Sequence, residues 1–307
     1  MTDHWIAIVN PNAGAGKCGR DWEIISSLLE KYDVPFRAYH TSRKYHAMVI
    51  TRHMVRQGMK KFIAIGGDGT LNEVINGVFS QTEVLTENIT IGMIPVGTGN
   101  DWARMFGIPF RYEEAVQTLI RENTFIQDVG RVLFTSNQKK IKRYFVNIAG
   151  IGFDALVTRK SNTLKESGKS SKLLYFWNIL IGLFGYRHFS ASIDVDGEIC
   201  ECDIFSMNVG ICQYSGGGMK QVPDAVPDDG IFDLTIIKKI GKFNVIRSLP
   251  KLYNGRIKYH PRVMSLNGKT IKVESSKIIF LETDGESLGH TPFEFEIIPR
   301  SIRVVTA

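Results

Sequence analysis

The segment from Lys61 to Val78 constrains the fold more than any other part of this chain. Its apolar first part is typical of a strand, which enters Gly66-Gly67-Asp68-Gly69-Thr70 and then a helix. Glycines let a backbone approach an anion without an intervening Cβ, and a helix N-terminus offers unpaired N–H groups with a partial positive charge. Asp68 adds a carboxylate that suits a magnesium ion. The segment therefore predicts a strand that ends in a phosphate site.

Part of the same motif also fits a structural role. Thr70 and Glu73 match the capping-box pattern S/T-x-x-E, which begins many helices. A helix cap needs neither two glycines before the aspartate nor one after it. We therefore favour the phosphate site and treat the capping box as an addition to it.

Strand-like and helix-like segments alternate up to Asp128. Short continuous apolar runs predict strands, and apolar residues at helical spacing predict helices. The strands are expected near Trp5–Val9, Pro35–Thr41, Lys61–Ile65 and Ile89–Val96, and the helices near Arg20–Tyr32, Lys44–Gln57, Leu71–Phe79 and Tyr112–Glu122. This alternation predicts an α/β fold with a parallel sheet, in which ligands bind at the carboxyl ends of the strands.

After Asp128 the pattern changes to alternating strands with hairpin turns. Asp196-Gly197 and Asn267-Gly268 are both typical of tight turns between antiparallel strands. We therefore predict two domains: a nucleotide-binding α/β domain over residues 1–127 and an antiparallel, β-sandwich-like domain over residues 128–299. The last strand, near residues 300–307, is expected to return to the first domain.

The composition is that of an ordinary globular protein, with 43% apolar and 22% charged residues. No signal-peptide pattern follows Met1, so we expect a cytoplasmic protein. Neither the cysteines nor the histidines have the spacing of a zinc site. The formal charge of +7 favours a negatively charged partner, and without a zinc-finger or RNA-recognition pattern nucleic acid is the weakest choice. A nucleotide and an anionic membrane surface remain.

One apolar run, residues 173–186, stands apart from its basic surroundings. It is too short to cross a bilayer, which takes about 20 residues. The run fits a buried helix of the second domain. It also fits a lipid-facing element, because it is flanked by basic groups that suit an anionic membrane: Lys165, Lys169, Lys172, Arg187 and His188.

The loop after the first strand contains Gly14, Gly16 and Gly19, which match G-x-G-x-x-G. A dinucleotide-binding fold also needs an acidic residue about 20 positions further on to hold the ribose. The second strand ends instead in Tyr39-His40-Thr41-Ser42, so a dehydrogenase is disfavoured. What remains is a flexible glycine loop that suits phosphates.

A third glycine junction, Pro95-Val96-Gly97-Thr98-Gly99-Asn100-Asp101, follows the fourth predicted strand. Thr98, Asn100 and Asp101 also suit the cap of the next helix. Three such junctions at the carboxyl ends of strands in one sheet would converge on one crevice. The sequence therefore predicts one nucleotide site shared by three loops.

The motifs Asn10-Pro11 with Gly14, Gly66 to Glu73, and Pro95 to Asp101 occur together in the first domain. This set resembles the catalytic domain shared by diacylglycerol kinases, sphingosine and ceramide kinases and the soluble bacterial lipid kinases. The resemblance runs essentially the whole length, because residues 147–157, 222–234 and 283–286 are similar to the second-domain motifs of that family, in the same order. G-G-D-G-T alone is less specific, since NAD kinases share it.

The resemblance implies a set of ATP contacts in the first domain. It also implies that Asp68 acts on the magnesium-bound phosphates. The implied ATP contacts are Asn10, Pro11, Asn12, Ala13, Gly14, Thr41, Gly67, Asp68, Gly69, Thr70, Leu71, Asn72, Glu73 and Thr98.

In the second domain the resemblance implies a further magnesium site and a general base. Asp229 would bind Mg²⁺ through its carboxylate, with the backbone carbonyls of Val226 and Ile231, and oxygen ligands suit that cation. Glu286 would take the proton from a lipid hydroxyl, supported by Asp284. Without the resemblance, both segments fit surface turns, and the polar residues after Glu286 are expected to lack an immediate partner strand.

We therefore expect an ATP- and magnesium-dependent kinase that phosphorylates diacylglycerol or a related lipid at an anionic membrane surface, with no transmembrane segment. Asp154 is expected either to face the lipid head group or to brace the domain junction. The alternatives are a kinase for a soluble acceptor such as NAD, a sphingosine-type lipid kinase and a nucleotide-binding regulator without catalysis. G-T-G-N-D at residues 97–101 disfavours sphingosine, and intact Asp68, Asp229 and Glu286 disfavour the regulator. A homodimer is compatible with the resemblance.

Overall fold

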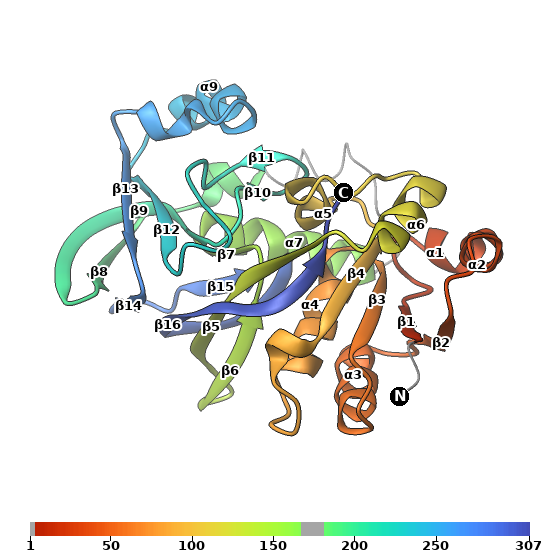
Figure 1. The fold of residues 1–307 in the computed structure, drawn as a ribbon. Coiled ribbons are helices and arrows are strands. Elements are labelled where there is room, and N and C mark those ends of the chain that lie inside the picture. The colour runs from red at the N-terminus through yellow and green to blue at the C-terminus, as the bar shows by residue number, and fades with distance from the viewer. Residues whose placement is uncertain (1–3, 167–180) are drawn as a thin grey trace. The chain divides into compact units, whose positions relative to one another are not determined.

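The computed structural model describes residues 4–166 and 181–307. The chain folds into two compact units (Figure 1). Unit 1 holds the residues up to Val129 together with Pro299–Ala307, and unit 2 holds Gly130–Ile298. Unit 1 alternates strands and helices, whereas unit 2 is rich in antiparallel strands. The predicted fold class is confirmed.

Unit 1 is built on a parallel sheet with the strand order β2-β1-β3-β4 (Figure 1). Its strands are β1 (Trp5–Val9), β2 (Phe36–His40), β3 (Lys61–Gly66) and β4 (Thr90–Pro95). Its helices are α1 (Lys17–Arg20), α2 (Trp22–Lys31), α3 (His46–Arg56), α4 (Asp68–Val78), α5 (Asp101–Met105) and α6 (Tyr112–Arg121), with the short 3₁₀ helix η1 (Thr86–Asn88). The end of the last strand pairs in parallel with β4 through Arg303 and Val304.

The central strands of this sheet are covered on both faces. Every residue of β1 is buried, as are all residues of β3 and β4 after the first. A strand covered on both faces needs apolar residues at successive positions, and this explains the continuous apolar runs in the sequence. The edge strand β2 is half-buried or exposed along its length.

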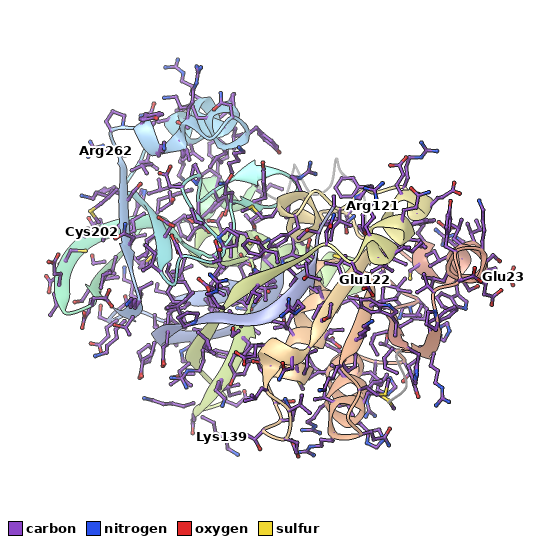
Figure 2. All side chains as sticks on the ribbon, viewed as in Figure 1. Glu23, Arg121, Glu122, Lys139, Cys202 and Arg262 are labelled. Atoms are coloured by element: carbon purple, nitrogen blue, oxygen red, sulfur yellow. The ribbon has the colours of Figure 1, made fainter. Side chains whose placement is uncertain are left out.

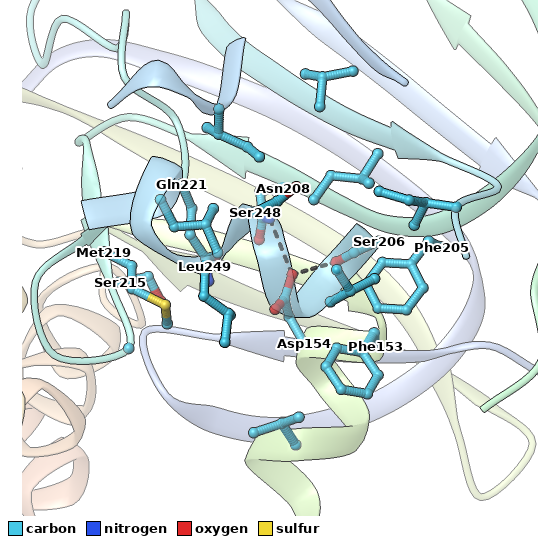
Figure 3. Close-up of a pocket in the computed structure, with 18 of the residues that line it drawn as sticks. Phe153, Asp154, Phe205, Ser206, Asn208, Ser215, Met219, Gln221, Ser248 and Leu249 are labelled. Carbon is cyan, nitrogen blue, oxygen red and sulfur yellow. Dashed lines mark hydrogen bonds between the residues drawn. The ribbon is translucent and has the colours of Figure 1, made fainter. Parts of the chain in front are cut away.

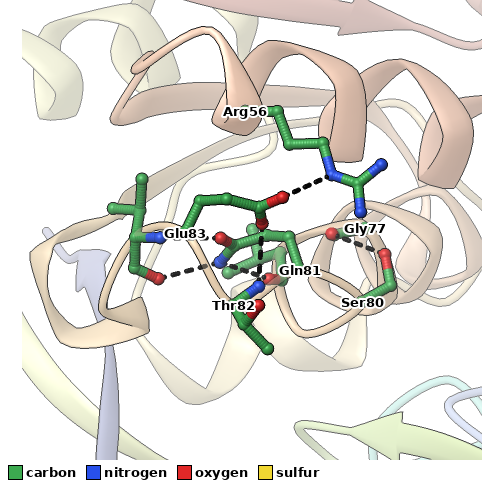
Figure 4. Close-up of polar contacts among 8 residues, drawn as sticks. Arg56, Gly77, Ser80, Gln81, Thr82 and Glu83 are labelled. Carbon is green, nitrogen blue, oxygen red and sulfur yellow. Dashed lines mark hydrogen bonds and ion pairs between the residues drawn. The ribbon is translucent and has the colours of Figure 1, made fainter.

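Helices α3 and α4 pack closely beside the sheet. A Cβ at Gly77 of α4 would lie 2.7 Å from the carbonyl oxygen of Met48, so glycine is needed for this approach. The loop after α4 is held by its own side chains and by one side chain of α3 (Figure 4). There Gln81 bonds to the backbone of Val78 and Val84, and Arg56 pairs with Glu83 at 3.0 Å.

Within the described residues, unit 2 consists of antiparallel strands, three helical elements whose bounds are given below and a helical stretch at residues 181–185 (Figure 1). The strands are β5 (Thr124–Ser136), β6 (Lys139–Phe145), β7 (Ile148–Gly152), β8 (Phe189–Val195), β9 (Glu198–Gly210), β10 (Tyr214–Ser215), β11 (Met219–Lys220), β12 (Phe232–Lys238), β13 (Val263–Gly268), β14 (Thr270–Glu274), β15 (Phe280–Thr283) and β16 (Glu286–Val305). The helices are α7 (Phe153–Glu166), α9 (Lys242–Tyr253) and the 3₁₀ helix η2 (Arg256–Tyr259). Strands β5 and β16 begin in one unit and end in the other.

The two predicted hairpin turns of unit 2 have different outcomes. Asp196 and Gly197 form a tight turn with φ of 52° and 95°, and Val195 pairs with Glu198, as expected. The turn predicted at Asn267-Gly268 is wrong, because both residues belong to β13 and pair with β12. The chain changes direction just after them, where the Asp196 carboxylate accepts hydrogen bonds from the N–H groups of Lys269 and Thr270.

Most of the apolar run at residues 173–186 lies outside the described residues. Within the described end of the run, Leu183 is buried against Phe153, Phe205 and Ile240. Phe184, the next residue, is 54% exposed. This end therefore contributes both to the core of unit 2 and to its surface.

Candidate active site

Three loops of unit 1 meet at the carboxyl ends of β1, β3 and β4 through close backbone contacts. A Cβ at Gly14 would lie 2.5 Å from the carbonyl oxygen of Val96, and Gly14 has a φ of 60°. A Cβ at Gly97 would lie 2.7 Å from the Cα of Gly67. Only glycine allows these approaches. The three glycine junctions of the sequence therefore lie against one another.

Asp68 links the first turn of α4 to the start of α5. Its Oδ2 accepts a hydrogen bond from the backbone N–H of Asp101 at 3.1 Å, and its Oδ1 accepts one from Trp102 at 3.2 Å. Charge-assisted bonds of this kind are stronger than neutral ones. The carboxylate is therefore anchored where the three loops meet, through a link to α5 that the sequence did not predict.

The capping box expected at Thr70 and Glu73 does not form. The N-cap glycine of α4 makes no side-chain cap, and the Thr70 hydroxyl accepts a hydrogen bond from Asn10 Nδ2 at 3.0 Å. Glu73 accepts hydrogen bonds from the N–H groups of Tyr45 at 2.7 Å and Ala47 at 3.0 Å. The unpaired N–H groups at the start of α3 attract this carboxylate, so Glu73 caps a neighbouring helix instead of its own.

The other expected ATP contacts differ in accessibility. Thr98 is exposed, and Thr41 is half-buried with its N–H donated to the Val9 carbonyl at 2.8 Å. Leu71 and Asn72 are buried within α4. The remaining positions are half-buried or exposed: Pro11, Asn12, Ala13, Gly67 and Gly69.

Unit 2 contains a pocket with apolar walls and a buried polar side (Figure 3). Its apolar residues include Phe153, Val157, Phe205, Ile237, Ile240, Val245, Leu249, Leu252, Ile257 and Val263. Its polar residues include Asp154, Ser206, Asn208, Gln221 and Glu282. Pockets of this kind, apolar with a few convergent polar groups, bind small amphipathic molecules.

Asp154 stands at the centre of the polar side. Its Oδ2 accepts hydrogen bonds from the Ser206 hydroxyl and, at 3.0 Å, from Asn208 Nδ2 (Figure 3). Burial raises the pKa of this carboxyl above its ordinary value, against the opposing effect of these hydrogen bonds. Asp154 therefore lines the pocket, and the role expected for it at a lipid head group stays a prediction.

Glu282 is a second acid in the pocket, and sequence reasoning missed it. It is 3% exposed, and its Oε2 accepts a hydrogen bond from the N–H of Gly285 at 2.9 Å. Burial, together with the charges of Asp154 and Asp284, raises its pKa well above the ordinary value. A Cβ at Gly150 would lie 2.6 Å from Glu282 Oε1, so a glycine on β7 makes room for this side chain. The only sequence signal for Glu282 is a single acidic residue after two apolar ones in the short strand β15.

Replacing Glu282 by glutamine is expected to stabilise the protein at neutral pH. A raised folded-state pKa means that the stability contributed by protonated Glu282 is present below its unfolded pKa and is lost as pH rises toward the folded pKa. Glutamine keeps the acceptor for the Gly285 N–H without this loss. The melting temperatures of wild type and Glu282→Gln should be similar at about pH 4. At about pH 7 the variant should have the higher melting temperature. A variant that melts lower than wild type at neutral pH would contradict the raised pKa of Glu282.

Asp284 and Gly285 form a two-residue turn between β15 and β16. Their φ angles of 49° and 83° suit a tight hairpin turn, and Ser287 pairs with Glu282. The expectation that the residues after Glu286 lack a partner strand is therefore wrong. Their partner, β15, spans only Phe280–Thr283 and is too short to produce a recognisable alternating pattern.

The Asp284 carboxylate fixes this turn to the start of β7. It is 6% exposed and accepts hydrogen bonds from the N–H groups of Val146 and Asn147 at 3.0 Å each and Ile148 at 3.3 Å. Glu286 follows as the first residue of β16 and is half-buried. Asp284 thus sets the backbone position from which Glu286 extends.

The predicted magnesium ligands lie in a turn before β12. Asp229 is exposed, its Oδ1 accepts a hydrogen bond from the Ile231 N–H at 3.1 Å, and Val226 is 44% exposed. Burial and the charges of Asp229 and Asp224 raise the pKa of nearby Asp233 to about 6. Among the side chains that the structure describes, no three from His, Cys, Asp or Glu are grouped to hold a metal ion. The expected set relies instead on one carboxylate and two carbonyls, all oxygen donors that suit Mg²⁺.

Both units match known protein families. Residues 147–306 match the family described as YegS C-terminal NAD kinase beta sandwich-like domain. Residues 4–132 match the family described as diacylglycerol kinase catalytic domain. The chain belongs to the diacylglycerol kinase catalytic-domain family. The resemblance inferred from its motifs is confirmed, and membership supports a phosphotransferase activity.

Relatives of this diacylglycerol kinase family member match along nearly their whole length. A diacylglycerol kinase of Staphylococcus carnosus (strain TM300) is 28% identical over 97% of this chain and 94% of its own. A diacylglycerol kinase of Staphylococcus saprophyticus subsp. saprophyticus is 29% identical with the same coverage, 97% and 94%. The crystal structure of a diacylglycerol kinase from Bacillus anthracis str. Sterne is 24% identical, with a TM-score of 0.75 over 100% of this chain and 98% of that one, and it supports the fold.

The described part of this family member contains no helix that is long and apolar enough to cross a membrane.

Proposed function

We propose that this protein is an ATP- and magnesium-dependent lipid kinase that transfers the γ-phosphate of ATP to a hydroxyl group of diacylglycerol or a related lipid. The observation that carries the proposal is the pocket of unit 2, with its apolar walls and the buried polar side chains around Asp154. A diacylglycerol combines acyl chains with a polar glycerol end and would match both parts. Family membership supports the kinase chemistry.

Unit 1 is the proposed nucleotide domain. The phosphates of ATP would lie against the glycine loops, where helix N-termini and exposed backbone N–H groups favour anions. Asp68 would position the phosphates from its anchored place beside α5. The residues proposed to contact ATP remain those of the loops at Asn10–Gly14, Thr41, Gly67–Glu73 and Thr98.

Unit 2 is the proposed lipid domain and carries the general base. Glu286 would accept the proton of the lipid hydroxyl as the phosphoryl group transfers. Asp284 would act by positioning, because its carboxylate is occupied by three backbone N–H groups at the start of β7. Asp154 would bind the polar end of the lipid within the pocket. Phosphoryl transfer depends mostly on such positioning and on charge stabilisation.

A bound Mg²⁺ would neutralise charge on the phosphates and help to orient them. Asp229 would hold a further ion through its carboxylate, with the carbonyls of Val226 and Ile231. The pKa of Asp233 is raised first by its burial and then by the charges of Asp229 and Asp224, so these neighbouring carboxylates favour a cation in this region.

Replacing Asp229 by asparagine is expected to raise the magnesium concentration for half-maximal activity by about ten-fold or more, because it removes the only proposed carboxylate ligand of that ion. The neighbouring Asp228→Asn variant removes the same charge and should leave this concentration nearly unchanged. Phosphate transfer measured against magnesium concentration provides the test. Equal shifts in the two variants would mean that the effect is general charge and not coordination.

The acceptor distinguishes the proposal from its alternatives. A kinase for a soluble acceptor would be stabilised by NAD, whereas the proposed enzyme should be stabilised by short-chain diacylglycerol and ATP. Thermal-shift titrations with diacylglycerol, sphingosine and NAD make this comparison directly. Stabilisation by NAD alone would favour the soluble-acceptor kinase, and stabilisation by sphingosine alone would favour the sphingosine-type enzyme.

A further inference from the structure

A long segment of unit 2 carries only positive charge. Residues 234–273, between Asp233 and Glu274, include ten lysines and arginines and no aspartate or glutamate. The segment contains the end of β12, all of α9 and η2, and strands β13 and β14. A block of this kind needs a negatively charged partner or leaves a strongly basic surface.

Helix α9 has two distinct faces within this segment. Val245, Ser248, Leu249 and Leu252 recur at helical spacing and line the pocket, where Figure 3 shows Ser248 and Leu249. On the opposite side, residues four apart form an outer row of Phe243, Arg247 and Lys251, all exposed. The helix therefore separates the pocket from solvent.

The outer row of α9 continues into the residues after the helix. Arg256, Tyr259 and Arg262 are also exposed, and Phe243 and Tyr259 are 75% and 74% exposed. We call Phe243, Arg247, Lys251, Arg256, Tyr259 and Arg262 the basic–aromatic face. Large exposed aromatic side chains beside cations are typical of elements that lie at a membrane interface.

Two residues near this face, Lys258 and His260, interact with charged groups. Lys258, which belongs to the same segment, pairs with Asp224 and is thereby partly neutralised. His260, which lines the pocket, has its pKa lowered by burial and by the charges of Lys251 and Arg262. Lys251 and Arg262 of the face therefore also act on a residue that lines the pocket.

We propose that the basic–aromatic face is the surface by which this protein docks on an anionic phospholipid bilayer. The cations would bind lipid phosphates while Phe243 and Tyr259 enter the headgroup region. Because α9 lines the pocket on its other face, docking would bring the pocket next to the bilayer that supplies its lipid. This deepens the proposed function and rests on it for the identity of the lipid. The docking surface then lies on α9 and the residues after it, while the lipid-facing role that the sequence left open for residues 173–186 stays a prediction.

The test is sedimentation of the full chain with vesicles of phosphatidylcholine and phosphatidylglycerol. The double variant Arg247→Glu/Lys251→Glu should bind these vesicles at least about ten-fold more weakly than wild type, and Phe243→Ala should weaken binding to a smaller extent. Wild-type binding should fall with added salt and be weak on phosphatidylcholine alone. Because all three side chains are exposed, the variants should fold like wild type. Circular dichroism and melting curves check this.

A matched control carries the same charge change elsewhere on unit 2. Lys139 and Lys142 are exposed on β6, and Figure 2 shows Lys139 at the opposite end of the unit from Arg262. Lys139→Glu/Lys142→Glu should retain binding within about two-fold if docking is local to the face. Equal loss in both double variants, or unchanged binding of Arg247→Glu/Lys251→Glu, would overturn the proposal. The proposal would also be overturned if the wild-type protein bound an RNA or DNA oligonucleotide through these residues but bound no vesicles.

Activity separates this proposal from the proposed function. On short-chain diacylglycerol in detergent micelles, the Arg247→Glu/Lys251→Glu variant should match wild type, while on long-chain diacylglycerol in vesicles it should be at least about ten-fold slower. If wild type phosphorylates no diacylglycerol but still binds anionic vesicles through the face, the proposed function fails and the docking surface stands. Equal losses on both substrates would contradict docking.

Discussion

Replacing Glu286 by glutamine is expected to lower the turnover number for lipid phosphorylation by about 100- to 10,000-fold, the range over which a positioned general base contributes. Glutamine preserves the size of the side chain but cannot accept the proton of the lipid hydroxyl. Binding of ATP, measured by titration, should change little, because the proposed nucleotide contacts belong to unit 1. The measurement is steady-state transfer from labelled ATP to diacylglycerol.

Glu282→Gln is the matched control for this substitution. It makes the same chemical change at a nearby acid of the same hairpin, but at a buried carboxyl whose raised pKa favours the protonated form, which is a poor proton acceptor. Activity at neutral pH should therefore be retained in Glu282→Gln and lost in Glu286→Gln. The opposite pattern would assign the base to Glu282, and near-normal activity in both would remove the general base from this hairpin.

Replacing Asp284 by alanine is expected to lower the free energy of unfolding by at least about 3 kcal/mol, since three buried backbone N–H groups would lose a charged acceptor. The matched control is Asp196→Ala. Asp196 also accepts three hydrogen bonds, from the N–H groups of Lys269 and Thr270 and from the Thr270 hydroxyl, but it is exposed. Water can replace those bonds, so the control should lose about 1 kcal/mol or less.

Chemical denaturation of both variants gives the comparison. A similar small loss in each would show that burial of the Asp284 contacts contributes little, and that Asp284 is not the main link between the hairpin and β7. If Asp284→Ala remains folded, its activity should fall through misplacement of Glu286. A conservative Asp284→Asn variant should recover part of the stability, because its carbonyl still accepts hydrogen bonds.

Local patterns in the sequence were sufficient for the fold class and for the parts of the site that lie within one motif. Continuous apolar runs identified β1, β3 and β4, because strands covered on both faces leave no position for polar residues. The glycine junctions marked the meeting of three loops, since glycines there are required by contacts such as Gly67 with Gly97. The Asp196-Gly197 turn followed from the same logic of positive φ angles.

Contacts between distant segments were not accessible in this way. Asp68 bonds to residues 33 and 34 positions away, and Glu73 bonds to a helix that precedes it, so neither partner is visible from a helix-capping pattern. Asn267-Gly268 has the composition of a turn but lies in a strand, because pairing with β12 outweighs local preference. Glu282 looks like one acid in a short apolar strand, and only its neighbours reveal that it lines a pocket.

The most direct test of the account is transfer of labelled γ-phosphate from ATP, with magnesium, to diacylglycerol, sphingosine and NAD presented separately, with the two lipids in mixed micelles. Diacylglycerol should be converted to labelled phosphatidic acid, and the transfer should require magnesium and be lost in Glu286→Gln. Labelled NADP without labelled lipid, or binding of ATP with no acceptor labelled, would contradict it.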